Sequence, residues 1–178
     1  MLAQLACLPL LAQNAGQTAA ADLRARIEAS AKLPFEGVHF AARAPGPGWE
    51  SGMVSWIAID PKGPIYELQR GDKADPVLVL DRDGKILRSW GKGNYTIPHS
   101  IRIDPAGNVW TVDAAVSTVI KYSPAGEKLI TITVGEQPRT RNAFNGTTDI
   151  AFGPNGRLFI TDGYGNARVL EYTADGGG

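Results

Sequence analysis

The chain has 178 residues, 43% of them apolar and 20% charged, and its 18 basic and 18 acidic side chains give a formal net charge of zero. A neutral chain has no basic field that would attract a polyanion, which argues against nucleic acid as a partner, and no apolar run reaches the ~18 to 20 residues of a membrane span. One cysteine and two histidines, His39 and His99, exclude a disulfide framework, a zinc finger and a self-contained three-histidine metal site. The 21 glycines and 12 prolines are scattered, which favours a β-rich fold with many tight turns.

The first 21 residues carry no charged side chain and have an apolar centre at residues 5–11, followed by small and amide residues. This pattern is typical of the apolar region and cleavage zone of a secretory signal peptide that lacks its basic start. We therefore interpret residues 1–21 as the remainder of a signal peptide and expect an extracytoplasmic protein, periplasmic or secreted. An alanine-rich N-terminus without a targeting role is the alternative.

A short helix and a linker are expected in residues 22–48. Apolar residues recur at near-helical spacing within residues 22–33, which predicts one amphipathic helix that ends before Pro34. The proline- and glycine-containing stretch that follows has the composition of a linker. The folded module is expected to occupy residues 49–178.

Three copies of one unit make up this module. Each copy opens with an apolar strand, a turn with glycine at its end, and a second apolar strand; the first strands and their turns are residues 57–63, 101–107 and 150–156. A third strand begins 20, 18 and 19 residues after each start, and a fourth closes the first two units. Proline sets φ near −65° at the first corner of these turns and glycine supplies the positive φ that closes a hairpin. Four antiparallel strands in about 40 to 45 residues are the period of a propeller blade.

The sequence therefore predicts an all-β propeller with blades at residues 51–95, 96–143 and 144–178. Propellers need about four to eight blades to close, so we expect a truncated chain, and a three-bladed chain that completes a ring with a second copy is the alternative. In either case the open edge predicts self-association. Leu158, Ile160 and Val169 of the last unit are expected to lose their cover.

Three side chains are expected to meet at one mouth of the central channel. The residue two before each first strand, and those twelve to fourteen after its start, lie opposite each other across the first hairpin, away from its turn. These positions place Arg70, His99 and Tyr164 together from three adjacent blades. A structural role is simpler for each residue alone, but together they predict a site for a small-molecule or peptide substrate. Asp113 and Asp162 share these positions, either as metal ligands of a hydrolase or lactonase or as strand-end hydrogen-bonding residues.

Four segments of the module resemble the NHL-repeat propeller of peptidyl-α-hydroxyglycine α-amidating lyase and its bacterial relatives. They are Leu68–Asp72 (LQRGD), Pro98–Ile101 with Gly107–Trp110 (PHSI and GNVW), Phe144–Asp149 (FNGTTD) and Asp162–Arg168 (DGYGNAR). The resemblance covers residues 48–176. It implies an NHL-type, six-bladed ring of which this chain holds about three blades, a channel zinc bound by three histidines, and a structural calcium bound largely by backbone carbonyls.

The resemblance also implies roles for individual residues. Arg70 would be the catalytic arginine, Tyr164 the catalytic tyrosine and His99 the first zinc ligand, while the carbonyls of Ile57 and Ile101 would bind calcium.

This sequence departs from the family at two positions. Trp56 stands where a small residue is usual and is expected to narrow the channel, and Thr147 replaces the usual proline.

The activity that the resemblance implies is cleavage of the N–Cα bond of a peptidyl-α-hydroxyglycine to a peptide amide and glyoxylate. One histidine does not make a catalytic zinc site, which uses about three protein ligands, so the chain alone is expected to be inactive. Family membership does not by itself establish catalysis. The alternative is a non-catalytic NHL propeller that binds a peptide or protein partner.

Overall fold

The computed structural model describes residues 8–135, 146–173 and 175–177. It separates into two units, residues 1–39 and residues 40–178. The first seven residues of the predicted signal peptide and the predicted blade boundary at 143/144 lie outside the described residues.

The first unit contains one helix, α1 (Leu8–Ala29). It begins earlier than the helix predicted for residues 22–33, because the preceding stretch is rich in alanine, leucine and glutamine, which are good helix formers. It also ends earlier than predicted, at Ala29. The helix ends where Ser30 donates from both its N–H (3.2 Å) and its hydroxyl (2.6 Å) to the carbonyl of Ile27. Within the described residues, no helix is both long and apolar enough to cross a membrane.

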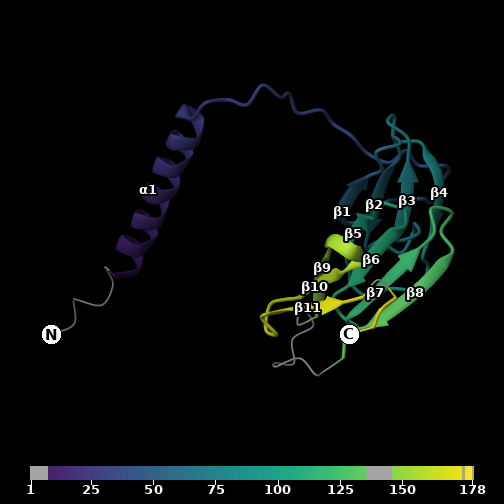
Figure 1. Ribbon diagram of the computed structural model, residues 1–178. Helices are drawn as coiled ribbons and strands as arrows, with labels where there is room; N and C mark the ends of the chain where they lie inside the picture. The colour runs from purple at the N-terminus through teal and green to yellow at the C-terminus, as the bar shows by residue number, and fades with distance from the viewer. Residues whose placement is uncertain (1–7, 136–145, 174, 178) are drawn as a thin grey trace. The chain divides into compact units, whose positions relative to one another are not determined.

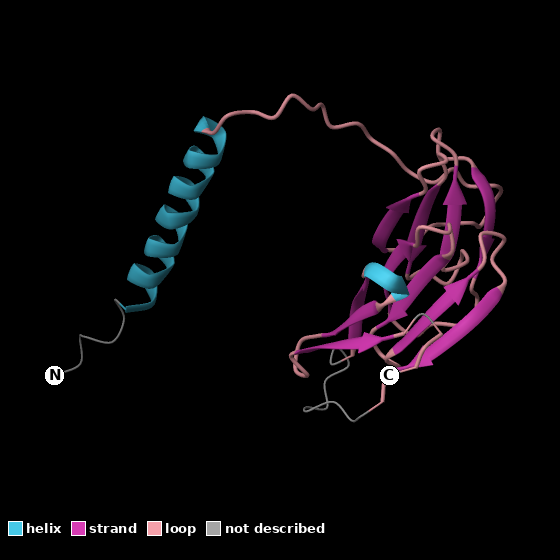
Figure 2. Ribbon diagram, viewed as in Figure 1, coloured by secondary structure: helices cyan, strands magenta, loops and turns pink. Residues whose placement is uncertain are grey.

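The second unit is built from three antiparallel sheets (Figures 1 and 2). The first sheet has the order β1 (Val54–Ile59), β2 (Ile65–Gln69), β3 (Val77–Leu80) and β4 (Ile86–Trp90). The second has the order β5 (Pro98–Ile103), β6 (Val109–Asp113), β7 (Thr118–Tyr122) and β8 (Lys128–Thr133). The third contains β9 (Thr147–Phe152), β10 (Leu158–Asp162) and β11 (Arg168–Tyr172). The three repeats predicted from the sequence are therefore three consecutive propeller-type sheets.

The turns follow the repeat pattern. In the second sheet the Asp104 carboxylate accepts the N–H groups of Ala106 and Asn108, and Gly107 closes the turn with a φ of 88°. The third sheet instead carries one 3₁₀ turn, η1 (Pro154–Gly156). In the described part of the module this single turn is the only helical element, as the propeller prediction requires.

Two apolar cores hold the sheets together. The first lies between the first two sheets and contains Tyr66, Leu68, Val77, Val79, Ile101, Val109, Ile120 and Tyr122. The second lies between the last two sheets and contains Trp110, Val112, Val119, Ile132, Val134, Ile150, Leu158 and Ile160. The expectation that Leu158 and Ile160 lose their cover is therefore wrong, since both face the second sheet and are buried. Only Val169 of that trio is exposed, at 62%.

The first strands of the three sheets are neighbours. Strand β5 contacts both β1 and β9, and each of these strands lies at one edge of its sheet. Residues that begin a first strand or follow a second strand therefore gather at one end of this row of inner strands.

Candidate active site

Arg70, His99 and Tyr164 lie together at that end. The imidazole of His99, in β5, meets the Tyr164 ring edge-on with 6.3 Å between ring centroids, and its Nε2 is 3.4 Å from the Tyr164 hydroxyl. The guanidinium Nε of Arg70 donates to the carbonyl of Pro98 at 2.9 Å. The structure thus brings together, from three sheets, the three side chains selected from the repeat register.

The tautomer of His99 follows from its partner. Nδ1 lies 2.8 Å from the carbonyl of Thr148, and a carbonyl only accepts, so Nδ1 carries the proton. Nε2 then presents its lone pair toward the Tyr164 hydroxyl. A backbone carbonyl that fixes one ring nitrogen is the usual support for a histidine that binds a metal through the other.

Tyr164 has an unusual backbone. Its φ is 51°, in the left-handed region that an aromatic residue seldom adopts. The loop that contains it is tied by hydrogen bonds from Gly163 N–H to the Gly146 carbonyl (3.1 Å) and from Asn166 N–H to the Gly163 carbonyl (3.3 Å). The side chain is 62% exposed, so the phenol is open to solvent beside His99.

The acidic alternative does not fit the structure. The carboxylates of Asp113 and Asp162 are buried rather than directed into the mouth. The Asp113 carboxylate accepts four backbone N–H groups, those of Thr96, Ile97, Ala115 and Val116, and the Asp162 carboxylate accepts from Asn166 and Arg168. Both are strand-end hydrogen-bonding residues, which removes the basis for a hydrolase or lactonase.

The residues expected to offer carbonyls to calcium occupy equivalent positions on the inner strands. Ile57 pairs with Glu67 and Ile101 with Thr111. The Asp60 N–H donates to the Pro64 carbonyl and the Asp104 N–H donates to the Asn108 carbonyl, both at 2.9 Å. These bonds identify the first hydrogen-bonded residue pair in each of the two hairpins.

Hydrogen-bonded and non-hydrogen-bonded pairs alternate in an antiparallel ladder. Counting back from these two bonds places Ile57 and Ile101 in non-hydrogen-bonded pairs. Their carbonyls therefore point away from β2 and β6, toward the open edge of the inner strands, where a cation could be bound.

An interaction between three sheets, which sequence reasoning missed, runs beside the site. Arg102 of β5 binds the carboxylate of Asp149 of β9 through two nitrogens, with 3.0 Å from Nε to Oδ1, and its guanidinium carbon lies 4.8 Å from the centre of the Trp56 ring of β1. Trp56 also packs against the first core. Burial raises the pKa of Asp149, but hydrogen bonds from Arg102 and from the Ile150 N–H outweigh burial and hold that pKa below its ordinary range. The only signal in the sequence was a charged residue within each of two inner strands.

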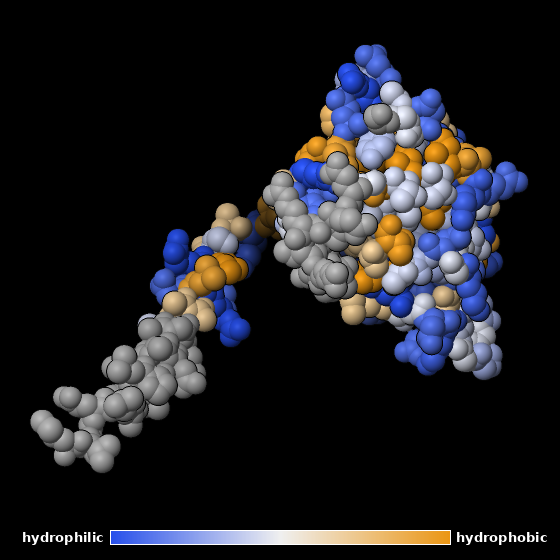
Figure 3. Space-filling model, turned by 90° about the horizontal axis from the view of Figure 1, so that it is seen from below, coloured by the Kyte–Doolittle hydropathy of each residue, from blue (hydrophilic) through white to orange (hydrophobic). Residues whose placement is uncertain are grey.

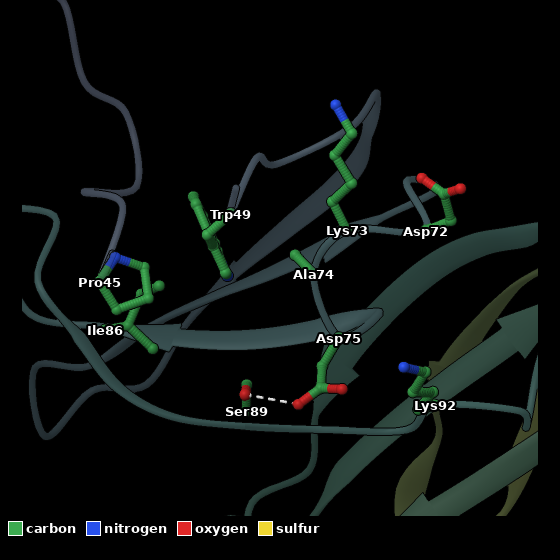
Figure 4. A pocket seen from close by; sticks show the side chains of 9 residues that line it. All are labelled: Pro45, Trp49, Asp72, Lys73, Ala74, Asp75, Ile86, Ser89 and Lys92. Atoms are coloured by element: carbon green, nitrogen blue, oxygen red, sulfur yellow. Dashed lines mark hydrogen bonds between the residues drawn. The ribbon is translucent and has the colours of Figure 1, made fainter. Parts of the chain in front are cut away.

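Among the described residues, two cavities lie away from this site. One, of about 530 Å³, lies between the turns at the opposite ends of the inner strands and includes Ile59, Ile103 and Phe152. The other, of about 250 Å³, lies beside the first sheet (Figure 4). In that one Asp75 accepts a hydrogen bond from Ser89 at 2.6 Å, which uses one of its carboxylate oxygens. Neither cavity is lined by Arg70, His99 or Tyr164.

Across the described ranges, no group of three histidine, cysteine, aspartate or glutamate side chains is arranged to hold a metal ion. His99 fits one zinc ligand, because the Thr148 carbonyl holds its Nδ1–H and its Nε2 lone pair faces the site beside the Tyr164 hydroxyl. This chain could therefore supply one ligand of a catalytic zinc.

Comparisons with known proteins support the fold and the resemblance. No family model matches the chain. It is 36% identical over 119 residues to peptidyl-alpha-hydroxyglycine alpha-amidating lyase 1 of Drosophila melanogaster, a match that covers 65% of this chain and 21% of that protein. It is 30% identical over 140 residues to NHL repeat-containing protein 3 of Mus musculus, covering 70% of this chain and 40% of that protein.

Solved structures agree on the architecture. The module superposes on a catalytically inactive virginiamycin B lyase from Staphylococcus aureus with a TM-score of 0.52 and 21% identity, covering 71% of this chain and 43% of that one. At this identity the likeness concerns the fold alone. The chain thus has the fold of part of a β-propeller with NHL-type repeats, and its sequence is similar to that of the peptidyl-α-hydroxyglycine α-amidating lyases.

Proposed function

We propose that this chain is part of an amidating-lyase-like propeller that cleaves the N–Cα bond of a peptidyl-α-hydroxyglycine to give a peptide amide and glyoxylate. The observation that carries the proposal is the meeting of Arg70, His99 and Tyr164 at one end of the inner strands. The names of the relatives support the reaction class. These relatives are longer, since the match covers only 21% of the first of them.

The proposed substrate carries a carboxylate, a hydroxyl and an amide nitrogen on one carbon. The Arg70 guanidinium donates through Nε to the Pro98 carbonyl. Its two terminal nitrogens form a planar pair of donors, which suits a carboxylate. The Tyr164 oxygen, in its deprotonated phenolate form, would take up the hydroxyl proton as general base.

The bond changes balance without a co-reactant. Loss of the hydroxyl proton lets the oxygen electron pair form the C=O bond of glyoxylate, the N–Cα bond breaks, and the amide nitrogen takes up a proton. A zinc ion, when bound, supplies Lewis acidity that lowers the pKa of the substrate hydroxyl. His99 would be one of its ligands through Nε2. The carbonyls of Ile57 and Ile101 would contribute to a structural calcium site.

Substitutions in the longer protein separate the roles of Tyr164 and His99. Tyr164→Phe should lower the rate of glyoxylate release by about 10²-fold or more, the loss typical of a general base, and leave the zinc content unchanged. His99→Ala should lower the zinc content itself. Metal analysis and a glyoxylate assay on the same preparations check both, and equal zinc content in the wild type and His99→Ala would disprove the ligand role.

A non-catalytic propeller that binds a peptide or protein is the second candidate, favoured by the similarity to NHL repeat-containing protein 3. This candidate predicts no glyoxylate release and no stoichiometric zinc in the longer protein. Under the first proposal the chain of 178 residues alone has no lyase activity. Release of glyoxylate by this chain would contradict the need for three zinc ligands.

We further propose an extracytoplasmic location. The uncharged, apolar start of the chain supports it. Secretion of a reporter fused to residues 1–48 tests it, with the same fusion carrying Leu8→Lys and Leu11→Lys as the control, since charges within the apolar stretch abolish signal function.

A further inference from the structure

The residue that ends the second strand of each sheet is polar and almost completely buried. These residues are Gln69, Asp113 and Asp162, with exposures of 0%, 0% and 1%. Each stands twelve residues after the start of its repeat. A buried polar group costs free energy unless it is hydrogen-bonded, and each of the three bonds to a segment that carries or supports a site residue.

Gln69 forms hydrogen bonds with the segment before β1 and with the loop that follows Arg70. Its Oε1 accepts the N–H groups of Gly52 (2.8 Å) and Gly71. Its Nε2 donates to three loop carbonyls, those of Gly71, Ala74 and Asp75, at 3.2, 3.0 and 3.1 Å. The loop that follows Arg70 is thereby fastened to the end of its own strand.

Asp162 does the same for the loop of Tyr164. Its Oδ1 accepts from Asn166 Nδ2 at 2.8 Å and its Oδ2 accepts from Arg168 Nε at 2.7 Å. Both partners follow Tyr164 in the chain, so the loop is closed around the tyrosine.

Asp113 holds His99 from two directions. Its Oδ2 accepts the N–H groups of Thr96 (2.6 Å) and Ile97 (2.8 Å), which fixes the segment that leads into His99. Its backbone carbonyl accepts the hydroxyl of Thr147 at 2.9 Å, and the next residue offers the carbonyl that receives the proton of His99 Nδ1. Asp113 thus holds both the segment that precedes His99 and the strand whose carbonyl selects the His99 tautomer.

We propose that Gln69, Asp113 and Asp162 are positioning residues for Arg70, His99 and Tyr164, and that Asp113 holds the His99 imidazole in its Nδ1–H form with Nε2 toward the site. Thr147 supplies the second contact of this arrangement through its hydroxyl. The inference rests on the proposed function, because positioning matters only if Arg70, His99 and Tyr164 form an active site. Its test measures the imidazole and not the reaction, so the two can fail separately.

The test is the tautomer ratio of His99, measured by nitrogen and carbon NMR on histidine-labelled protein at about pH 8.5, where an ordinary imidazole is neutral. The sequence contains only two histidines, so the spectrum contains two imidazoles, and the exposed His39 serves as the internal reference. In the wild type the Nδ1–H form should dominate for His99.

Asp113→Asn and Thr147→Val are the two variants. In Asp113→Asn one oxygen becomes an amide nitrogen, which donates and cannot accept N–H groups, and in Thr147→Val the bond to the Asp113 carbonyl is lost. Each should lower the ratio of Nδ1–H to Nε2–H at His99 by about fivefold, the effect of one ordinary hydrogen bond, and leave His39 unchanged.

Matched controls isolate the effect. Thr118→Val removes a buried hydroxyl that has no hydrogen-bond partner among the described residues and that lies on the residue opposite Asp113. Asp104→Asn removes a carboxylate from the turn at the other end of the same hairpin. Both should leave the His99 ratio as in the wild type.

The Thr147→Val variant decides the matter if Asp113→Asn does not fold. A folded Thr147→Val or Asp113→Asn protein with the wild-type His99 ratio overturns the inference. So does a control that shifts the ratio as much as these variants do.

Discussion

The ion pair between Arg102 and Asp149 shows how one residue of an inner strand can connect three sheets. The pair is partly exposed, so solvent screens it and its contribution to stability is about 1 kcal/mol, at the upper end of the range for surface pairs because two nitrogens contact the carboxylate. The Trp56 ring on the other side of the guanidinium adds a cation–π contact.

This pair predicts a pH dependence of stability. The pKa of Asp149 is lowered in the folded protein, so its contribution is present above the unfolded pKa of about 3.9 and is lost as the pH falls through the folded value. Arg102→Met should lower the free energy of unfolding by about 1 kcal/mol at pH 7, and this difference should shrink below about pH 4.

Urea denaturation at a series of pH values measures the difference in unfolding free energy between the wild type and Arg102→Met. Arg88→Met is the matched control, because Arg88 donates to the neutral Tyr66 hydroxyl and its effect should not depend on pH in the acid range. A difference between wild type and Arg102→Met that stays constant down to pH 2 would rule out the pair as its source.

At the scale of the elements, the turns set how closely neighbouring sheets pack. Gly126, in the turn between β7 and β8, has a φ of 94°, and a Cβ there would lie 2.8 Å from the Trp90 ring of the first sheet. The turn therefore serves both its own hairpin and the contact between two sheets.

Alanine at this position should destabilise the module. Gly126→Ala adds the cost of a left-handed backbone, about 1 kcal/mol, to an overpacking cost of about 1–3 kcal/mol at the tryptophan. Gly93→Ala provides the comparison, because Gly93 has a φ of 78° but open space around its Cβ position. Chemical denaturation of both variants gives the packing contribution as the difference, and equal destabilisation would show that Trp90 moves aside without cost.

At the scale of the whole molecule, the third sheet leaves a strand edge open. Among the described residues β11 pairs only with β10, whereas β3 and β7 each pair on both sides. One face of the module shows hydrophobic residues near its centre and hydrophilic residues at its corners (Figure 3). An unpaired strand edge with apolar side chains favours association with another chain.

We therefore expect the chain to dimerise or aggregate with increasing concentration. Val169→Lys on β11 should weaken this association, because a charge on an edge strand opposes edge-to-edge pairing. Val116→Lys, at an exposed valine in the turn between β6 and β7, is the matched control. Sedimentation velocity over a range of concentrations tests this, and a compact monomer throughout would contradict it.

The sequence by itself determined the repeating elements and the register of the site. Apolar strands, proline- and glycine-containing turns and a fixed spacing depend on neighbours in the chain, so they predicted the order and approximate positions of the strands and placed Arg70, His99 and Tyr164 at one end. Only the tertiary structure decided that Leu158 and Ile160 are covered by the second sheet, that Arg102 finds Asp149, and that the buried Asp113 holds the segment before His99. These contacts join residues far apart in the sequence, and burial and hydrogen-bond geometry across sheets leave no periodic signal in one chain.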